Sequence, residues 1–137
     1  MAIDAIYGRH KEMEVKRLLP KIYNKKFKFY SEDIYATFDF MSEDENMILE
    51  LKSRRCKSNT YPTTIVGLNK VLKGKQLQRD NDKVVKFLFN FTDGLYEWDN
   101  QEYTIQPGGR TDLAGNKGWK DYAHINIRDL KLLQSYS

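Results

Sequence analysis

Two strand-like segments separated by a short polar turn limit most strongly how this chain can fold. Residues 35–41 (YATFDFM) and 47–52 (MILELK) are rich in aromatic, β-branched and other large apolar side chains, which favours extended strands. Residues 42–46 (SEDEN) between them are polar and predict a turn. The sequence therefore predicts a β-hairpin against which the remaining elements must pack.

Hydrophobic periodicity predicts a helix before this hairpin. Residues 9–23 carry apolar side chains at positions i, i+3, i+4 and i+7, namely Val15, Leu18, Leu19 and Ile22. This apolar stripe is expected to face a sheet. A short strand is predicted directly after the helix, over residues 27–30, because aromatic residues dominate there.

A second helix is predicted after the hairpin, over residues 61–74. Asn59 and Thr60 before Tyr61-Pro62 resemble a polar cap followed by proline in the first helical turn. In this helix Ile65, Leu68 and Leu72 are expected to face inward. Asn69, Lys70 and Lys73 are expected to be available to solvent or a ligand.

The rest of the chain is predicted to form several further strands. Strands are expected over residues 83–91, 95–98, 103–106 and 124–127, with a hairpin turn at Asp93-Gly94, a Gly-rich loop over residues 107–118 and a short terminal helix or turn. This order of elements indicates an α/β or α+β fold with a central mixed sheet flanked by helices. No linker-like segment divides the chain, so one domain over residues 1–137 is predicted.

Composition excludes several classes of protein. No segment approaches the roughly 20 apolar residues that span a bilayer, and the amino-terminal segment is charged where a signal peptide needs an apolar block. The single cysteine, Cys56, excludes an internal disulfide and a cysteine-based zinc site. We therefore expect a soluble, intracellular protein without membrane contact, from a cellular host, a virus or a phage.

Strand alternation brings charged residues of the hairpin together. Glu50 and Lys52 lie on one face of their strand, and if the hairpin turns about Asp44, Asp39 lies opposite Glu50. Phe38 and Phe40 are then expected to point away from Asp39, toward the other face. Two facing carboxylates repel each other unless a cation lies between them or one binds a proton. A hard divalent ion such as Mg²⁺ or Mn²⁺ removes this conflict.

A lysine beside such a metal site suits phosphodiester hydrolysis. Lys52 lies two residues after Glu50, where its ammonium can orient the attacking water and stabilise negative charge on a phosphate. Three further basic residues follow Lys52 closely in the sequence, namely Arg54, Arg55 and Lys57. The net charge of the chain is +4. A nucleic acid is therefore the expected partner.

These residues resemble those of a known superfamily. Phe38-Asp39, ten intervening residues and then Glu50-Leu51-Lys52-Ser53-Arg54 resemble the PD-(D/E)XK nucleases, and ELKSR with the preceding helix is similar to archaeal-type Holliday-junction resolvases. The resemblance covers residues 8–75. Phe38 departs from the pattern, because the family has proline before the aspartate. The resemblance implies a restriction-endonuclease-like αβββαβ core and cleavage of DNA that leaves a 5′-phosphate.

The resemblance also implies roles for individual residues. Asp39, Glu50 and the backbone carbonyl of Leu51 are expected to hold Mg²⁺ or Mn²⁺, while Lys52 positions the attacking water. The resolvases carry a helical glutamate four residues after a glycine, and Gly8 and Glu12 have this spacing. Glu12 is therefore expected to join the catalytic metal site, with Glu14 as the alternative.

Five basic residues are expected to contact the phosphates of the substrate: Arg54, Arg55, Lys70, Lys73 and Arg110. The predicted function is a Mg²⁺-dependent nuclease that acts on DNA as a homodimer, for example as a Holliday-junction resolvase. One alternative is an RNA endonuclease of the viral cap-snatching type, in which His10 binds the metal. The other is a non-catalytic module that binds nucleic acid on the same fold.

Overall fold

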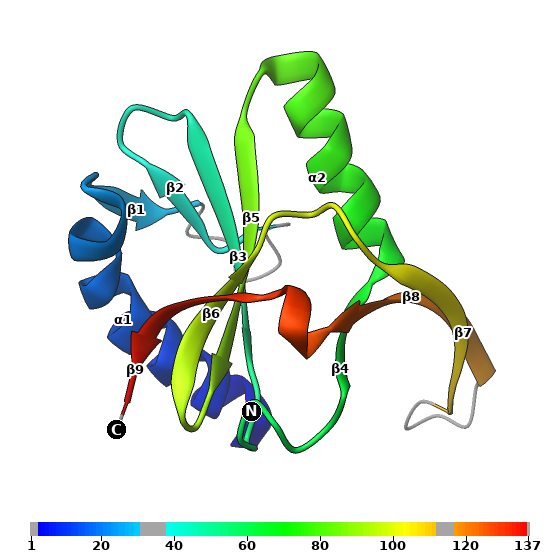
Figure 1. The fold of residues 1–137 in the computed structure, drawn as a ribbon. Coiled ribbons are helices and arrows are strands. Elements are labelled where there is room, and N and C mark those ends of the chain that lie inside the picture. The colour runs from blue at the N-terminus through cyan, green and yellow to red at the C-terminus, as the bar shows by residue number, and fades with distance from the viewer. Residues whose placement is uncertain (1–2, 31–37, 112–116, 137) are drawn as a thin grey trace.

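The computed structural model of the chain has two helices and two β-sheets (Figure 1). It describes residues 3–30, 38–111 and 117–136, and of residues 3–9, 108–111 and 117–120 it describes the backbone only. The elements in chain order are α1 (Ile3–Tyr23), β1 (Phe27–Phe29), β2 (Phe40–Ser42), β3 (Met47–Ser53), β4 (Thr63–Gly67), α2 (Leu68–Asn81), β5 (Val84–Phe91), β6 (Gly94–Trp98), β7 (Thr104–Thr111), β8 (Lys117–Asn126), a 3₁₀ turn (Ile127–Asp129) and β9 (Lys131–Ser135).

The larger sheet has six strands in the order β1-β2-β3-β5-β6-β9. Strands β3 and β5 run parallel, whereas the other neighbouring pairs are antiparallel, so the predicted α+β class with a mixed central sheet is confirmed. The smaller sheet has the order β4-β8-β7 and is antiparallel throughout. The connection that joins parallel β3 to β5 contains β4 and α2.

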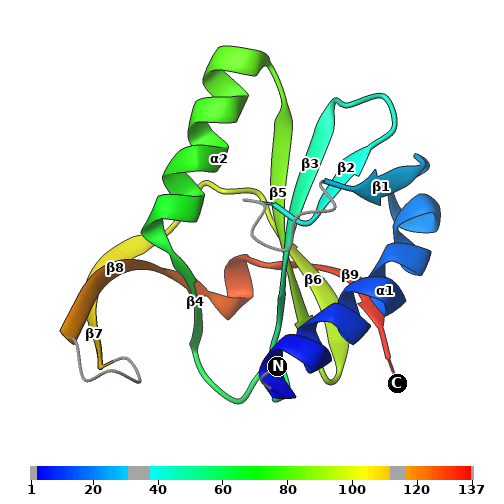
Figure 2. The ribbon, with the colours of Figure 1, turned by 180° about the vertical axis from the view of Figure 1, so that it is seen from behind.

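Helices α1 and α2 cover opposite faces of the larger sheet (Figures 1 and 2). Val15 and Leu19 of α1 pack with Leu49 and Leu51 of β3 in one cluster. On the other face, Val71 of α2 belongs to a second cluster, which contains Ile48, Val66, Val85, Phe87 and Phe89. Strand β3 alternates between the two clusters, as the period of a strand requires. Hence the face with Ile48 also carries Glu50 and Lys52.

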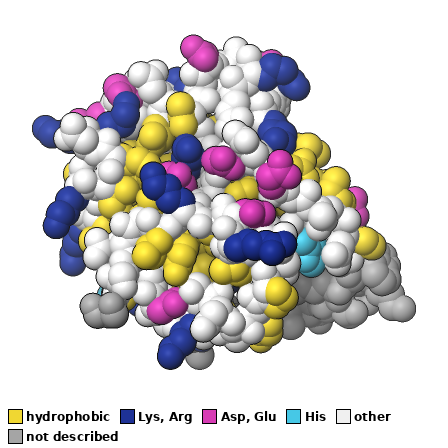
Figure 3. All heavy atoms as spheres, in the orientation of Figure 1, with side chains coloured by type: hydrophobic (Ala, Val, Ile, Leu, Met, Phe, Trp, Pro, Cys, Tyr) yellow, Lys and Arg dark blue, Asp and Glu magenta, His cyan; other side chains and the backbone are white. Residues whose placement is uncertain are grey.

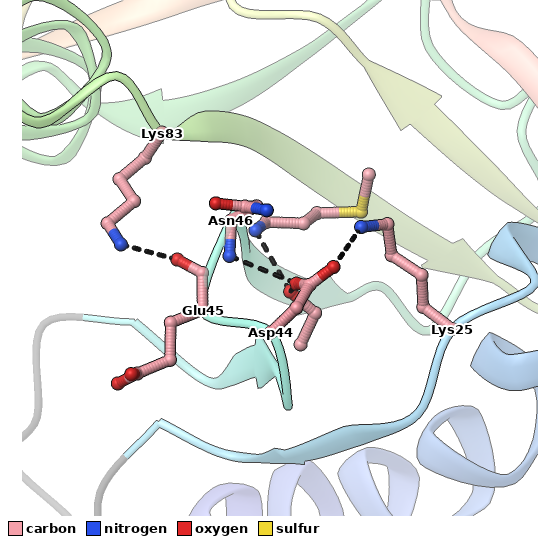
Figure 4. A network of polar contacts seen from close by, with 7 residues as sticks. Lys25, Asp44, Glu45, Asn46 and Lys83 are labelled. Atoms are coloured by element: carbon pink, nitrogen blue, oxygen red, sulfur yellow. Dashed lines mark hydrogen bonds and ion pairs between the residues drawn. The ribbon is translucent and has the colours of Figure 1, made fainter.

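The turn between β2 and β3 is held by a polar network (Figure 4). The Asp44 carboxylate accepts hydrogen bonds from the Ser42 hydroxyl and the Asn46 backbone N–H, and the Lys25 ammonium pairs with it. Lys83 donates to the backbone carbonyl of Glu45. The hydrogen bonds that Asp44 accepts, chiefly those from Lys25 and Ser42, lower its pKa. The contacts of this network connect the turn to β1 and β5, and thereby stabilise the register of the hairpin.

The first half of the predicted second helix is wrong, because residues 63–67 form β4. Thr63, Thr64, Ile65 and Val66 are β-branched, and β4 pairs with β8 from Thr63↔Asn126 to Gly67↔Tyr122. A strand partner so distant in sequence outweighs the local capping signal at Tyr61-Pro62. Helix α2 starts at Leu68. Ile65 and Leu72, predicted to face inward, are 37% and 53% exposed.

Other boundaries also differ from the prediction. Helix α1 begins at Ile3, six residues before the predicted residue 9. Strand β2 begins at Phe40, and residues 35–37 of the predicted strand lie outside the described part. Pro107 to Thr111 continue β7 rather than form a loop, and the chain ends in β9, which was not predicted. Within the described part of the chain, neither helix is long and apolar enough to cross a membrane.

Candidate active site

Asp39 lies at the point where β2 begins and the chain bends. Phe40 pairs with Leu49, and the Asp39 backbone N–H donates to the Leu49 carbonyl at 3.1 Å, so the regular pairing ends next to Asp39. The Asp39 side chain shares a hydrogen bond with Glu50. The Leu51 N–H then donates to Asp39 Oδ2 at 2.7 Å. The carboxylate thus satisfies a backbone donor of β3 at the position where the ladder with β2 stops. This bond fixes the Asp39 side chain against the strand that carries Glu50.

Glu50 is a buried carboxyl in the centre of the larger sheet. Strand β3 lies between β2 and β5, and Glu50 is 3% exposed. The pKa of Glu50 is raised to about 9, chiefly by burial and then by a side-chain hydrogen bond to Asp39 and the Asp39 charge, against the opposing charges of Lys52 and Lys70. Without a metal, Glu50 therefore holds a proton at neutral pH.

Lys70 of α2 reaches the same carboxyl. Its Nζ lies 2.8 Å from Glu50 Oε2, although this buried oxygen has no well-aligned hydrogen bond among the described residues. The ammonium also lies over the Phe38 ring, 5.8 Å from the ring centroid. Phe38 packs in the cluster on the α2 face, whereas Phe40 packs in the cluster on the α1 face. The prediction that both rings share one face is wrong, because the bend at Asp39 interrupts strand alternation.

The oxygen donors at this position fit a hard divalent cation. Asp39 and Glu50 supply carboxylates, and the Leu51 carbonyl points to the same strand edge as the Leu51 N–H that contacts Asp39. The buried Oε2 atom of Glu50 is also poorly satisfied by the protein. A divalent cation held there would neutralise charge on a phosphate and activate water.

The comparison with known families agrees with this geometry. Residues 4–133 match the family described as phage putative PDDEXK endonuclease. The chain belongs to this family. A nuclease activity and a nucleic acid substrate are supported by the membership, and nucleases of this superfamily generally use divalent metals. A search of curated proteins found no significant match.

In this family member, the structure does not bring Glu12 together with Asp39 and Glu50. No three His, Cys, Asp or Glu side chains gather into a potential metal site among the residues that the structure describes. Val15, three residues after Glu12 on α1, packs on the sheet face opposite to Glu50. Glu14, the alternative, pairs with Lys11 at 3.2 Å and with His10 at 3.0 Å. His10 is therefore engaged on the helix surface.

The predicted phosphate-binding residues lie in different environments. Arg54 is half-buried, and its guanidinium donates to the Ile65 carbonyl. Arg55 and Lys73 are exposed. The backbone of Arg110 lies in β7, and its side chain lies outside the described part. Lys70 contacts Glu50 and is thus part of the candidate active site.

One cavity lies next to the end of β3, and another lies beside α1. One, of about 340 Å³, is lined by residues that follow Lys52 in the chain and by β4, including Arg54, Lys57, Tyr61 and Ile65. Another, of about 450 Å³, lies beside α1 and is lined by Lys11, Glu14, Asn90 and Tyr136. The first adjoins the end of β3, the strand that carries Glu50. The second lies against α1, on the sheet face opposite to Glu50.

Charges of both signs are mixed on the face seen in Figure 3. Basic side chains are spread around this face, and acidic ones gather near its centre. The described part of this face therefore shows no continuous basic surface.

Sequence reasoning missed the contact between Lys70 and Glu50. The β-branched run from Thr63 to Val66 was a signal for a strand, and a strand there shortens the helix so that Lys70 falls in its first turn. No local pattern indicates that this turn lies over Glu50. That proximity depends on how β4 and α2 cross the sheet between β3 and β5.

Proposed function

We propose that this chain is a Mg²⁺-dependent nuclease that hydrolyses DNA phosphodiester bonds. One observation carries the proposal: the half-buried Asp39 carboxylate contacts the buried Glu50 carboxyl on the sheet face that also carries Lys52. Such a pair is unfavourable without a compensating positive charge. Asp39, Glu50 and the Leu51 carbonyl would hold the cation, with Mn²⁺ as a substitute for Mg²⁺.

The chain's own side chains then have separate roles in hydrolysis. Lys52 orients a water molecule for in-line attack on phosphorus and stabilises the charge that develops on the phosphate. The bond from phosphorus to the 3′ oxygen breaks, so the products carry a 5′-phosphate and a 3′-hydroxyl. Arg54, Arg55 and Lys73 are proposed to contact flanking phosphates.

A cleavage assay tests the assignment. With Mg²⁺ or Mn²⁺ present, Asp39→Ala and Glu50→Ala should each lower the cleavage rate by at least about a hundredfold, because each removes a ligand of the cation. Asp80→Ala is the matched control, since Asp80 is an exposed carboxylate on α2 that pairs with Arg79. If both site variants cut as fast as the parent protein, the assignment is wrong.

Calorimetry separates this enzyme from a binding module with the same fold. The nuclease should bind Mg²⁺ and lose that binding in Asp39→Ala, whereas a module that only binds nucleic acid has no reason to bind Mg²⁺ through these carboxylates. Nucleic acid binding without Mg²⁺ binding would favour the module.

We further propose that the substrate is structured DNA and that the active form is a homodimer. The similarity of ELKSR to archaeal-type resolvases supports both points, and a chain of 137 residues offers little surface to enclose DNA alone. A panel of four-way junction, linear duplex, single-stranded DNA and RNA should show fastest cleavage of the junction. Light scattering should give twice the monomer mass; a monomer that cuts RNA fastest would contradict both points.

A further inference from the structure

We propose that the Lys70 ammonium supplies the positive charge next to Glu50 until a divalent cation binds there. The released ammonium then contacts the phosphate of the substrate. This inference rests on the proposed function. It assigns to Lys70 an ionic partner that changes between the metal-free and the metal-bound protein.

The first argument is the geometry at Glu50. Lys70 Nζ lies 2.8 Å from Oε2, and that carboxyl is 3% exposed. A buried carboxyl beside a second one, Asp39, needs positive charge close by. Of the two lysines whose charges act on Glu50, Lys70 is the one with its ammonium in direct contact.

The second argument is that the contact is easily exchanged. It is an ion pair without good hydrogen-bond alignment, and the Lys70 side chain remains 26% exposed. Its ammonium also lies over the Phe38 ring, which offers a second favourable surface for the cation when it leaves Glu50. Lysine suits such a move, because its charge sits on a flexible stem.

Competition for the same oxygen follows from these positions. A divalent cation between Asp39 and Glu50 would lie close to the present position of Lys70 Nζ, and like charges at that distance repel strongly where burial keeps the dielectric low. Lys70 therefore leaves Glu50 when the cation binds. Its place in the first turn of α2, on the same side of the sheet as Lys52, keeps it within the site.

Chemical labelling of lysine tests the displacement in the wild-type protein. Metal-free protein is treated briefly with isotopically labelled acetic anhydride, with and without Mg²⁺ and without nucleic acid, and acetylation at each lysine is measured by mass spectrometry. Mg²⁺ should raise the acetylation of Lys70 by at least about threefold, because the ion pair that shields it is lost. Exposed Lys73 on the same helix is the internal reference, and its acetylation should not change.

The outcomes distinguish this inference from the proposed function. If calorimetry shows that Mg²⁺ binds and Lys70 acetylation stays the same, the inference is wrong and the proposed function stands. If Mg²⁺ does not bind, both fail. In Asp39→Asn, which removes a ligand of the cation, Mg²⁺ should no longer alter Lys70 acetylation; a persistent rise would show an effect unrelated to the site.

A second variant separates positioning from a structural role. Lys70→Met should slow cleavage by at least about tenfold, because a charge is missing at the phosphate, while the Mg²⁺ affinity stays within about threefold of the wild type or becomes tighter. Arg79→Met removes one positive charge from the far end of α2 and should change neither property. An affinity for Mg²⁺ that falls together with the cleavage rate would contradict the proposal, because Lys70 would then help to build the cation site.

Discussion

At the scale of single residues, Glu50 shows how one side chain can be tuned by its surroundings. Burial and the facing Asp39 favour the neutral carboxyl, while Lys52 and Lys70 favour the charged form. In the metal-free protein, a proton and the Lys70 ammonium both compensate the charge of the pair. A divalent cation can replace both, so binding of the cation and loss of the proton are linked.

The raised pKa of Glu50 predicts how the stability of the metal-free protein depends on pH. The folded protein binds this proton more tightly than the unfolded chain, so the free energy of unfolding falls as the pH rises from about 4.5 toward 9. Glu50→Gln cannot ionise. In the presence of a chelator, its stability relative to wild type should therefore increase over this range, by on the order of a few kcal/mol, and then level off.

Urea denaturation at several pH values measures this difference. Asp80→Asn, an exposed carboxylate paired with Arg79, is the control and should track the wild type. A Glu50→Gln advantage that is equally large at pH 5 and pH 9 would contradict the burial argument.

Lys52 should matter for chemistry rather than for cation binding. Lys52→Ala removes the group that is proposed to orient the attacking water, so the turnover rate should fall by roughly a hundredfold to a thousandfold. The Mg²⁺ affinity measured by calorimetry should change little, since the lysine is not a ligand. Loss of Mg²⁺ binding in Lys52→Ala would instead indicate that the variant disturbs the site as a whole.

At the scale of elements, the site depends on a hairpin whose register is set at its turn. The Asp44 network holds the turn between β2 and β3, and the register then places Asp39 beside Leu51 and Glu50. The hairpin and the register were predictable, because the alternation of side chains and the polar turn are local features. The start of α2 was not, because β4 is stabilised by β8, some sixty residues later.

The close approach of β6 and β9 gives a test of the sheet itself. A Cβ atom added at Gly94 would lie 2.9 Å from the backbone carbonyl oxygen of Gln134 and 3.2 Å from Leu132. Gly94→Ala should therefore destabilise the protein by about 1–3 kcal/mol, since backbone must move to make room.

Thermal unfolding of Gly94→Ala measures this cost. Gly67→Ala is a suitable comparison, because the added Cβ would meet only the flexible Asn69 side chain. Equal stability of the two variants would contradict the packing of β9 against β6.

At the scale of the whole molecule, the two faces of the larger sheet have different tasks. Helix α1 covers one face with apolar contacts. The other face carries Glu50 and Lys52, and Lys70 of α2 contacts Glu50 there. The net charge of +4 is modest, and Figure 3 shows both signs mixed on one side. Local phosphate contacts, rather than a strong overall field, should therefore dominate the affinity for DNA.

Salt dependence measures how many such contacts form. The affinity for duplex DNA in a chelator should fall as salt increases, with a logarithmic slope of about −0.9 for each phosphate neutralised. Replacing exposed Arg55 by alanine should weaken binding to unrelated sequences equally. It should also reduce the magnitude of this slope by about 0.9, the value for one phosphate contact. An unchanged slope would show that Arg55 does not contact phosphate.

The sequence by itself determined the class of fold, through the order of its predicted elements, and the proximity of Asp39 to Glu50, through the hairpin that joins their two segments. The tertiary structure decided what surrounds that pair. It brings Lys70 to Glu50, places Phe38 under the same ammonium and sets α1 against the opposite face of the sheet. These contacts join segments far apart in the chain, and they depend on sheet pairing and layer packing that no local pattern encodes.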